Sequence, residues 1–94
     1  MARAIYKGTV LAESDTVQRV EGNLYFPPDS INRSHFQESS LHTTCFWKGI
    51  ASYYDIVVDS EVVKNAAWYY PEPKSAAKNI TNHVAFYGMV TVEP

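Results

Sequence analysis

The chain has 94 residues, with 8 Lys and Arg against 10 Asp and Glu, and its formal net charge is −2. A chain of this length buries only about 60 to 65% of the surface that it exposes when unfolded, so we expect one domain over residues 1–94. The near-neutral charge offers no basic face for a phosphate backbone, which excludes nucleic acid as an expected partner.

Cysteine content and the lengths of the apolar runs indicate the cellular compartment of the protein. A single cysteine cannot form an internal disulfide, and residues 1–7 lack the apolar stretch of a signal peptide. No uninterrupted apolar run approaches the length that spans a membrane. The sequence therefore predicts a cytoplasmic protein with no membrane partner.

Two hairpins are predicted near the start of the chain, because β-branched and aromatic runs flank short turns that contain glycine. The first joins residues 4–6 and 9–12 through Lys7-Gly8, and the second joins 17–21 and 24–26 through Gly22-Asn23. Pro27-Pro28 ends the second hairpin, since proline cannot donate to a strand ladder.

The segment from Pro27 to Thr44 is polar and aperiodic. Asp29 or Ser30 could begin a single helical turn there. A structureless stretch of this length in so small a domain is either a functional loop or an element that the pattern does not reveal.

A third hairpin is predicted over 51–58 and 61–70, with Asp59-Ser60 as its turn. Pairing Val58 with Glu61 places Asp55 opposite Lys64 and Ile56 opposite Val63. An opposite-charge pair on one face and an apolar pair on the other are typical of a half-buried hairpin. Tyr53 and Trp68 then share one face, while Tyr54 and Tyr69 share the other.

The last quarter of the chain predicts one short helix and one strand pair. Pro73 suits the first helical position, Ala76, Ala77 and Ile80 form an apolar stripe, and Asn82 can cap the end, which predicts a helix over 73–81. A final strand pair is predicted over 84–86 and 89–92, across Tyr87-Gly88.

The aromatic residues gather in consecutive clusters rather than being spread evenly. These are Phe46-Trp47, Tyr53-Tyr54 and Trp68-Tyr69-Tyr70. Consecutive residues of a strand point to opposite faces, so the members of one cluster cannot all lie in one core. We therefore expect some of them to be exposed, in a pocket or in a subunit interface.

Cys45 is the candidate nucleophile, because Lys48 could stabilise a thiolate and His42 or Glu21 could act as a base. The competing interpretation is that a lone cysteine beside Phe46 and Trp47 is a small buried hydrophobe. No metal site is predicted, since His35, His42 and His83 supply no second closely spaced ligand pair.

Five sequence blocks span nearly the whole chain and are specific in combination. They are Gly8-Thr9-Val10-Leu11-Ala12-Glu13-Ser14, Glu21-Gly22-Asn23-Leu24-Tyr25-Phe26-Pro27-Pro28, Cys45-Phe46-Trp47-Lys48-Gly49, Ala51-Ser52-Tyr53-Tyr54 and Ala66-Ala67-Trp68-Tyr69-Tyr70-Pro71-Glu72-Pro73. Through these blocks the chain resembles the bacterial family known as domain of unknown function 427. Phe46 departs from the family's usual proline, which would fix a backbone dihedral beside the cysteine.

The resemblance implies a small, mainly β domain similar to the β-tent folds, built from antiparallel hairpins with one short helix near 73–81. Relatives of that fold usually keep a zinc between cysteine pairs, which this chain lacks. The family is also labelled nucleotidyltransferase-like, but this chain has no Gly-Ser followed by an Asp-x-Asp pair to hold magnesium and nucleotide phosphates.

The leading hypothesis is a small molecule bound in an aromatic-lined pocket around the Cys45–Lys48 block. Its predicted lining is Tyr25, Cys45, Lys48, Tyr53, Trp68 and Tyr69. Two alternatives remain open. One is a thiol-dependent enzyme that uses Cys45, and the other is a structural protein whose surplus aromatics form a homodimer face. No cofactor is predicted.

Overall fold

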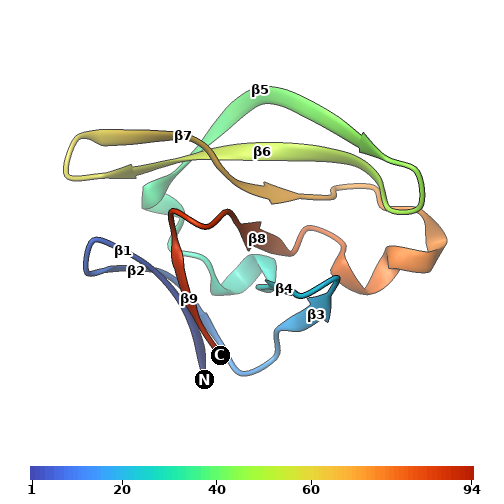
Figure 1. The fold of residues 1–94 in the computed structure, drawn as a ribbon, viewed down its shortest axis with the longest axis horizontal. Coiled ribbons are helices and arrows are strands. Elements are labelled where there is room, and N and C mark those ends of the chain that lie inside the picture. The colour runs from blue at the N-terminus through green and yellow to red at the C-terminus, as the bar shows by residue number, and fades with distance from the viewer.

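An antiparallel sheet of four strands in the order β5-β6-β7-β8 runs across the computed structural model, which describes residues 1–94 (Figure 1). Its strands are β5 (Phe36–Cys45), β6 (Gly49–Val58), β7 (Glu61–Tyr69) and β8 (Val84–Phe86). The chain is mainly β and built from antiparallel hairpins, as the sequence predicts.

Two smaller sheets lie beneath this four-stranded sheet (Figure 1). The three-stranded sheet, in the order β2-β1-β9, contains β1 (Ala2–Tyr6), β2 (Thr9–Ser14) and β9 (Thr91–Glu93). The two-stranded sheet contains β3 (Gln18–Val20) and β4 (Asn23–Tyr25). Short 3-10 helices η1 (Pro28–Ser30), η2 (Arg33–His35) and η3 (Ser75–Ile80) connect the strands.

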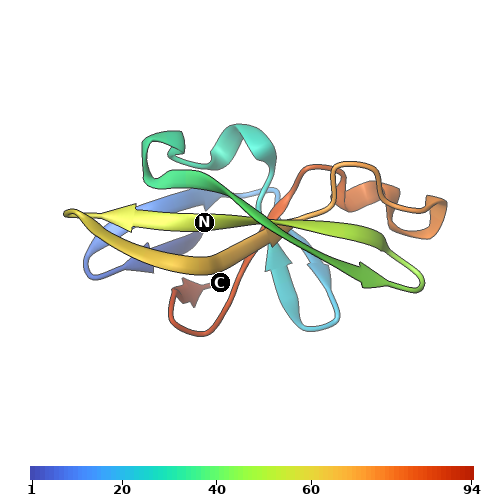
Figure 2. The same cartoon turned by 90° about the horizontal axis from the view of Figure 1, so that it is seen from above.

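Strand β6 changes the face that it buries halfway along its length. In its first half Ala51 and Tyr53 are buried while Ile50 is exposed, and in its second half Ile56 and Val58 are buried. Successive side chains alternate between faces, so the two halves present opposite faces to the interior. A strong twist near the middle of the sheet accommodates this change (Figure 2).

The interior is accordingly divided into two hydrophobic clusters. The first face of the sheet carries Tyr54 and Ile56 and packs on the sheet β2-β1-β9 through Ala4 and Leu11. The second face carries Tyr53 and Ala85 and packs on the β3–β4 hairpin and η3, through Tyr25, Ala77 and Ile80. Figure 1 shows the two smaller units side by side under the two halves of the large sheet.

Both neighbours of β6 are irregular at the same level. Strand β5 pairs Glu38 with Tyr54 and then His42 with Ser52, so it has two more residues than β6 over this interval. Strand β7 likewise has two more residues than β6 between the pairs Ile56–Val63 and Tyr54–Ala67. Such bulges increase the local twist of the sheet. Because each bulge adds an even number of residues, the side chains on either side of it keep the same alternation between the two faces.

Three predicted hairpins are present. Strands β1 and β2 flank Lys7-Gly8, and β6 pairs with β7 with Val58 opposite Glu61 and Ile56 opposite Val63. In the second hairpin Val20 pairs with Asn23, so its turn is Glu21-Gly22 rather than Gly22-Asn23. Glu21 has φ of 53° and Gly22 of 79°, a left-handed turn that matches the twist of two flanking strands.

Two predictions of secondary structure are corrected, and the question about the aperiodic segment is answered. The second half of that segment belongs to the ten-residue strand β5, which η1 and η2 precede. Strands β8 and β9 do not pair with each other, because β8 pairs with β7 and β9 with β1. The helix predicted over 73–81 is the 3-10 helix η3, interrupted at Ala77. A segment this short has little intrinsic helical stability.

The members of one aromatic cluster do not share one core, as predicted. Tyr53 and Tyr54 point to opposite faces, and both are buried because each face has its own cluster. The expectation that some of the aromatics are exposed is confirmed for Phe46, with 85% of its surface exposed at the turn between β5 and β6. None of the helices of this protein could span a membrane.

Candidate functional site

Tyr25, Tyr53, Trp68, Tyr70 and Tyr87 gather under the second face of the large sheet and are called the aromatic cluster below. Trp68 donates its indole N–H to the Tyr25 hydroxyl over 3.1 Å, and the two rings meet edge to face at 6.2 Å. Trp68 also contacts Tyr87, with 4.6 Å between ring centroids, and Tyr87 stacks on Tyr53 at 6.4 Å. These contacts fix the orientation of each ring.

Hydroxyl groups at one side of the aromatic cluster form a short chain. The Tyr53 hydroxyl lies 2.8 Å from Thr43 Oγ1 and 3.4 Å from the Tyr87 hydroxyl. The hydrogen bond with Tyr53, together with burial, raises the pKa of Tyr87 to about 12. Tyr87 is therefore a neutral hydroxyl at physiological pH and can donate or accept a hydrogen bond.

A buried ammonium group closes the other side of the cluster. Lys48 Nζ donates to Glu21 Oε1 and lies 5.5 Å from the centroid of the Tyr70 ring. Trp47 donates its indole N–H to the other carboxylate oxygen of Glu21 over 3.3 Å. The ion pair ties the turn between β5 and β6 to the turn of the β3–β4 hairpin.

Both partners of this pair are ionised. Burial by itself lowers the pKa of Lys48, but the hydrogen bond to Glu21 and the nearby Tyr25 and Tyr70 outweigh burial, and the pKa is raised. Hydrogen bonds from Lys48 and Trp47 lower the pKa of Glu21. Neither group is placed to exchange protons near pH 7, so the pair acts as a structural contact rather than as an acid and base.

Gly49 lets the chain fold closely around Lys48. Its φ is 113°, and a Cβ atom there would lie 3.4 Å from the Glu72 carbonyl oxygen and 3.5 Å from the Lys74 nitrogen. The Lys74 N–H donates to the Lys48 carbonyl over 2.8 Å. Glycine is favoured here because other residues rarely adopt this φ, whereas the distances from a Cβ atom to the segment after β7 are those of ordinary contacts.

Cys45 and His42 lie on opposite faces of strand β5. Cys45 is half-buried and packs against the second-face cluster. His42 points to the first face, where its Nδ1 lies 3.2 Å from Ser52 Oγ. The carboxylate of Glu21 is held by Lys48 and Trp47. The structure thus brings neither of the predicted bases into a hydrogen bond with the thiol.

Most of the predicted site residues meet, and one does not. Tyr25, Tyr53, Trp68 and Cys45 share the second-face cluster, and Lys48 lies against its member Tyr70. Tyr69 lies on the first face, stacked on Tyr54 with ring centroids 4.5 Å apart. Burial raises the pKa of Tyr69 to about 12, and its hydroxyl donates to Glu38 over 3.4 Å.

The space between the predicted site residues is filled by their own side chains. The molecule has four surface cavities, and none of them is lined by Glu21, by Cys45 or by any member of the predicted aromatic pocket. One of these cavities lies immediately beside them.

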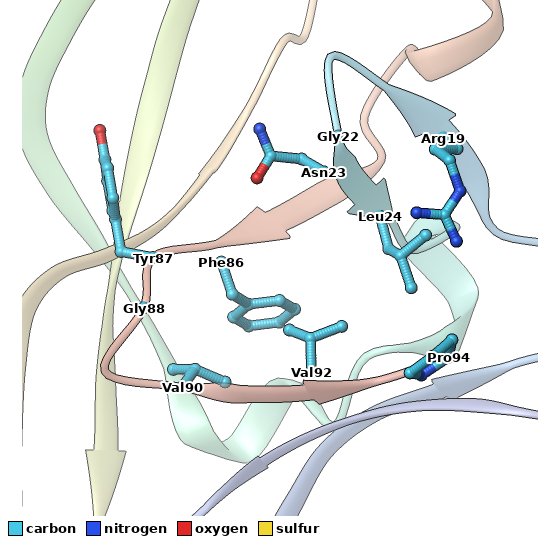
Figure 3. Close-up of a pocket in the computed structure, with 10 residues that line it drawn as sticks. All are labelled: Arg19, Gly22, Asn23, Leu24, Phe86, Tyr87, Gly88, Val90, Val92 and Pro94. Atoms are coloured by element: carbon cyan, nitrogen blue, oxygen red, sulfur yellow. The ribbon is translucent and has the colours of Figure 1, made fainter.

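This concave site, called the β4–β9 cleft below, has a volume of about 340 Å³ and lies between the β3–β4 hairpin and the chain from β8 to β9 (Figure 3). Phe86, Val90 and Val92 form one side, and Leu24 projects toward them from β4. Tyr87 stands at one end and Arg19 at the other. The full lining is Arg19, Gly22, Asn23, Leu24, Phe86, Tyr87, Gly88, Val90, Val92 and Pro94.

Sequence reasoning missed this cleft because its two sides come from segments that only the tertiary fold brings together. Tyr87-Gly88 is predicted as a hairpin turn, whereas residues 87–90 form a turn that leads from one sheet to another, with Val90 N–H donating to the Tyr87 carbonyl over 3.0 Å. The alternation of buried Val90 with exposed Met89 and Thr91 is the signal that a buried wall exists there.

Metal ligands do not cluster in the chain. No group of three or more His, Cys, Asp or Glu side chains lies close enough together to hold a metal ion.

Comparison with protein families gives one match. Residues 1–93 match a family model described as a domain of unknown function, DUF427. No curated protein sequence matches the chain.

Proposed function

Because the chain belongs to the DUF427 family, whose description leaves its activity open, we propose that the protein binds a small molecule in the β4–β9 cleft. The observation that carries the proposal is a concave site with an apolar side and an aromatic end, next to the aromatic cluster. A volume of about 340 Å³ falls within the range of small-molecule sites.

The walls of the cleft are held in place before any ligand arrives. Tyr87 is fixed by Trp68 on one side and by the ring and hydroxyl of Tyr53 on the other. Phe86 is buried and meets Phe26 edge to face at 5.7 Å. A preformed wall saves the ordering cost that a mobile one would impose on binding.

The predicted aromatic residues acquire a supporting role in this proposal. Tyr25, Tyr53 and Trp68 hold Tyr87, while the Glu21–Lys48 pair holds the hairpin that supplies Gly22, Asn23 and Leu24. The proposed ligand site lies beside the predicted pocket, and Tyr87 links the two through its contacts with Tyr53 and Trp68. Cys45 lines no cavity, so no specific observation favours a thiol-dependent reaction.

A fragment screen by saturation-transfer NMR tests the proposal. Hits are mapped by the methyl shifts of Leu24, Val90 and Val92. The Gly88→Phe variant adds a ring to the cleft lining at a position where a Cβ meets no atom within 4 Å and φ is not left-handed. We expect it to weaken mapped hits by about tenfold or more.

Met89→Phe is the matched control, because it adds a ring one residue further along, at a side chain that is exposed and outside the cleft lining. It should bind the hits as the wild type does. Hits that shift only resonances elsewhere, or that bind Gly88→Phe with unchanged affinity while the variant keeps its thermal stability, would show that the cleft is not the binding site.

A further inference from the structure

Three cations of the chain have no partner, and one of them lines the β4–β9 cleft. Arg3, Lys7, Lys48 and Lys64 are each paired with a carboxylate, and Lys74 donates to the Phe46 carbonyl. Arg19, Arg33 and Lys78 make no side-chain hydrogen bond or ion pair in the chain. Of these three, only Arg19 borders a cavity.

Among side chains, the charge of the cleft is therefore of one sign, and Pro94, the last residue of the sequence, also belongs to the lining. Among its lining side chains Arg19 is the only charged group, and no Asp or Glu side chain is present. Arg19 and Leu24 also line an adjoining cavity of about 230 Å³ that contains Asp15, but the Asp15 carboxylate lies 3.4 Å from the Met1 amino group and does not pair with Arg19. The guanidinium keeps all five of its N–H donors available.

A second polar group in the cleft is also unpartnered. Asn23 is half-buried and its side-chain amide makes no hydrogen bond in the chain, although the turn beside it is closed by Glu21 and Gly22. Figure 3 shows Asn23 between Arg19 and Tyr87, above the apolar side formed by Phe86, Val90 and Val92. The polar groups thus follow one rim and the apolar groups the opposite side.

We propose that the ligand of the β4–β9 cleft is a small carboxylate with an apolar body, whose carboxylate pairs with Arg19 and whose body lies on Phe86, Val90 and Val92 toward Tyr87. This inference rests on the proposed function and adds the chemical class of the ligand. A single guanidinium matches a planar carboxylate through two parallel N–H···O bonds.

The same lining argues against other charged classes. A purely cationic ligand would bring an ammonium group toward the Arg19 guanidinium, and no Asp or Glu side chain lines the cleft to receive it. A phosphate carries a larger charge, and the cleft has only one cation to meet it. The apolar side favours a body without further charges, because burying an unpaired charge is costly.

Three probes of matched shape test the inference: 3-phenylpropionate, the uncharged 3-phenylpropionamide and the cationic 3-phenylpropylamine. Each is titrated into the wild type and followed by the shifts of Leu24, Val90 and Val92 methyl groups. We expect the acid to bind about tenfold more tightly than the amide, and the amine to bind least. The advantage of the acid should shrink as the salt concentration rises.

Two arginine variants locate the charge. Arg19→Gln should lower the affinity of the acid to that of the amide and leave the affinity of the amide unchanged. Arg19→Lys should keep only part of the advantage of the acid, because lysine supplies the charge but not the bidentate geometry. Arg33→Gln is the control, since it removes an equally unpartnered arginine that lines no cavity. It should leave all three affinities unchanged.

The outcomes separate the ligand class from the proposed function. Equal binding of acid and amide at the cleft overturns the carboxylate inference and leaves the cleft as a small-molecule site. An acid advantage that survives Arg19→Gln also overturns the inference. If the acid at about 10 mM shifts no methyl signal of Leu24, Val90 or Val92, the carboxylate inference is overturned as well. The fragment screen then decides separately whether the cleft binds any ligand.

Discussion

Lys48 and Glu21 form an ion pair with unequal burial. The Lys48 side chain is only 9% exposed, whereas Glu21 is 50% exposed. Loss of Glu21 would leave an ammonium group buried beside Tyr70 without a counter-charge, but loss of Lys48 would leave a carboxylate that water can reach. The two partners should therefore respond very differently to replacement.

We expect Glu21→Ala to lower the free energy of unfolding clearly. Lys48→Met keeps the length of the side chain, so its free energy of unfolding should stay within about 1 kcal/mol of the wild-type value. Urea unfolding of both variants measures the difference. The double variant, Glu21→Ala with Lys48→Met, should recover most of the stability lost in Glu21→Ala. Equal losses in the two single variants would contradict this account.

Asp55 is a buried carboxylate that makes stability depend on pH. Burial by itself raises its pKa, but hydrogen bonds from the Asn65 N–H at 2.8 Å and from Lys64 Nζ at 3.0 Å together outweigh burial, and the pKa of Asp55 is lowered. A lowered folded-state pKa stabilises the fold fully above the unfolded-state value of about 3.9. This contribution is lost as pH falls through the folded-state pKa.

We expect Asp55→Asn to reduce the free energy of unfolding by about 1 to 3 kcal/mol at pH 7, because the charged acceptor is lost. The difference from the wild type should shrink as pH falls below about 4, because the unfolded chain takes up the proton first, and it should be lost once pH is below the lowered folded-state pKa. Denaturant titrations between pH 7 and pH 2 give the measurement. Asp59→Asn, at the exposed turn of the same hairpin, should show no comparable change.

Among the elements, strand β6 offers a direct test of the change of buried face. Ile50 and Ile56 are separated by an even number of positions in one strand, so their side chains point to the same face. Ile50 is nevertheless 58% exposed, whereas Ile56 is 0% exposed. Ile56→Ala should cost about 2 to 5 kcal/mol, because it leaves a cavity in the first-face cluster. Ile50→Ala should change stability by less than about 0.5 kcal/mol.

Similar losses at the two positions would mean that β6 buries one face along its whole length. The two residues are isoleucines of the same strand and face, and both pair with β5, although only Ile56 also pairs with β7. Chemical denaturation of the two variants is enough to decide.

Prediction from sequence succeeded for elements whose pairing is local. The hairpins around Lys7-Gly8 and Asp59-Ser60 are set by their turns and by alternation within a few residues, and the Asp55–Lys64 ion pair was visible as opposite charges in register. Strand β5 was missed because most of its residues are exposed on both faces, so no period of two marks it. Strands β8 and β9 needed distant partners that no local pattern indicates.

Part of the candidate site, like part of the fold, was predicted from the sequence. The meeting of Tyr25, Tyr53 and Trp68 follows from alternation in the β6–β7 hairpin and from the motif that contains Tyr25. The error at Tyr69 is of another kind, since alternation already places Tyr69 opposite to Trp68. The sequence does not predict that Arg19, Tyr87 and Val92 line one cleft. Arg19 and Val92 belong to two different sheets, and Tyr87 follows a strand of the third.

At the scale of the whole molecule, the two hydrophobic clusters share one sheet and should unfold together. Tyr53 and Tyr54 are adjacent in β6 but belong to different clusters, so the backbone of this strand joins the two. Loss of either cluster would expose one side of β6. The domain is therefore expected to unfold in a single cooperative transition.

Two probes report on the clusters separately. Trp47 and Trp68 both pack against the second-face cluster, so their fluorescence follows that cluster, while the methyl signals of Leu11 follow the first-face cluster. Urea transitions measured by the two signals should have the same midpoint. Midpoints that differ beyond experimental error would show that each half of the molecule has its own stability.

The paired bulges of β5 and β7 have a consequence for how the chain can change in length. Each adds two residues beside β6, whereas the β1–β2 pair takes up one extra residue, Leu11, between the pairs Ala4–Ala12 and Ile5–Val10. Removal of Ser40 and Leu41 together should leave a folded domain with a flatter sheet, and removal of Ser40 alone should leave a folded domain with a single-residue bulge of the kind in the β1–β2 pair. These two places should accordingly tolerate natural changes in chain length.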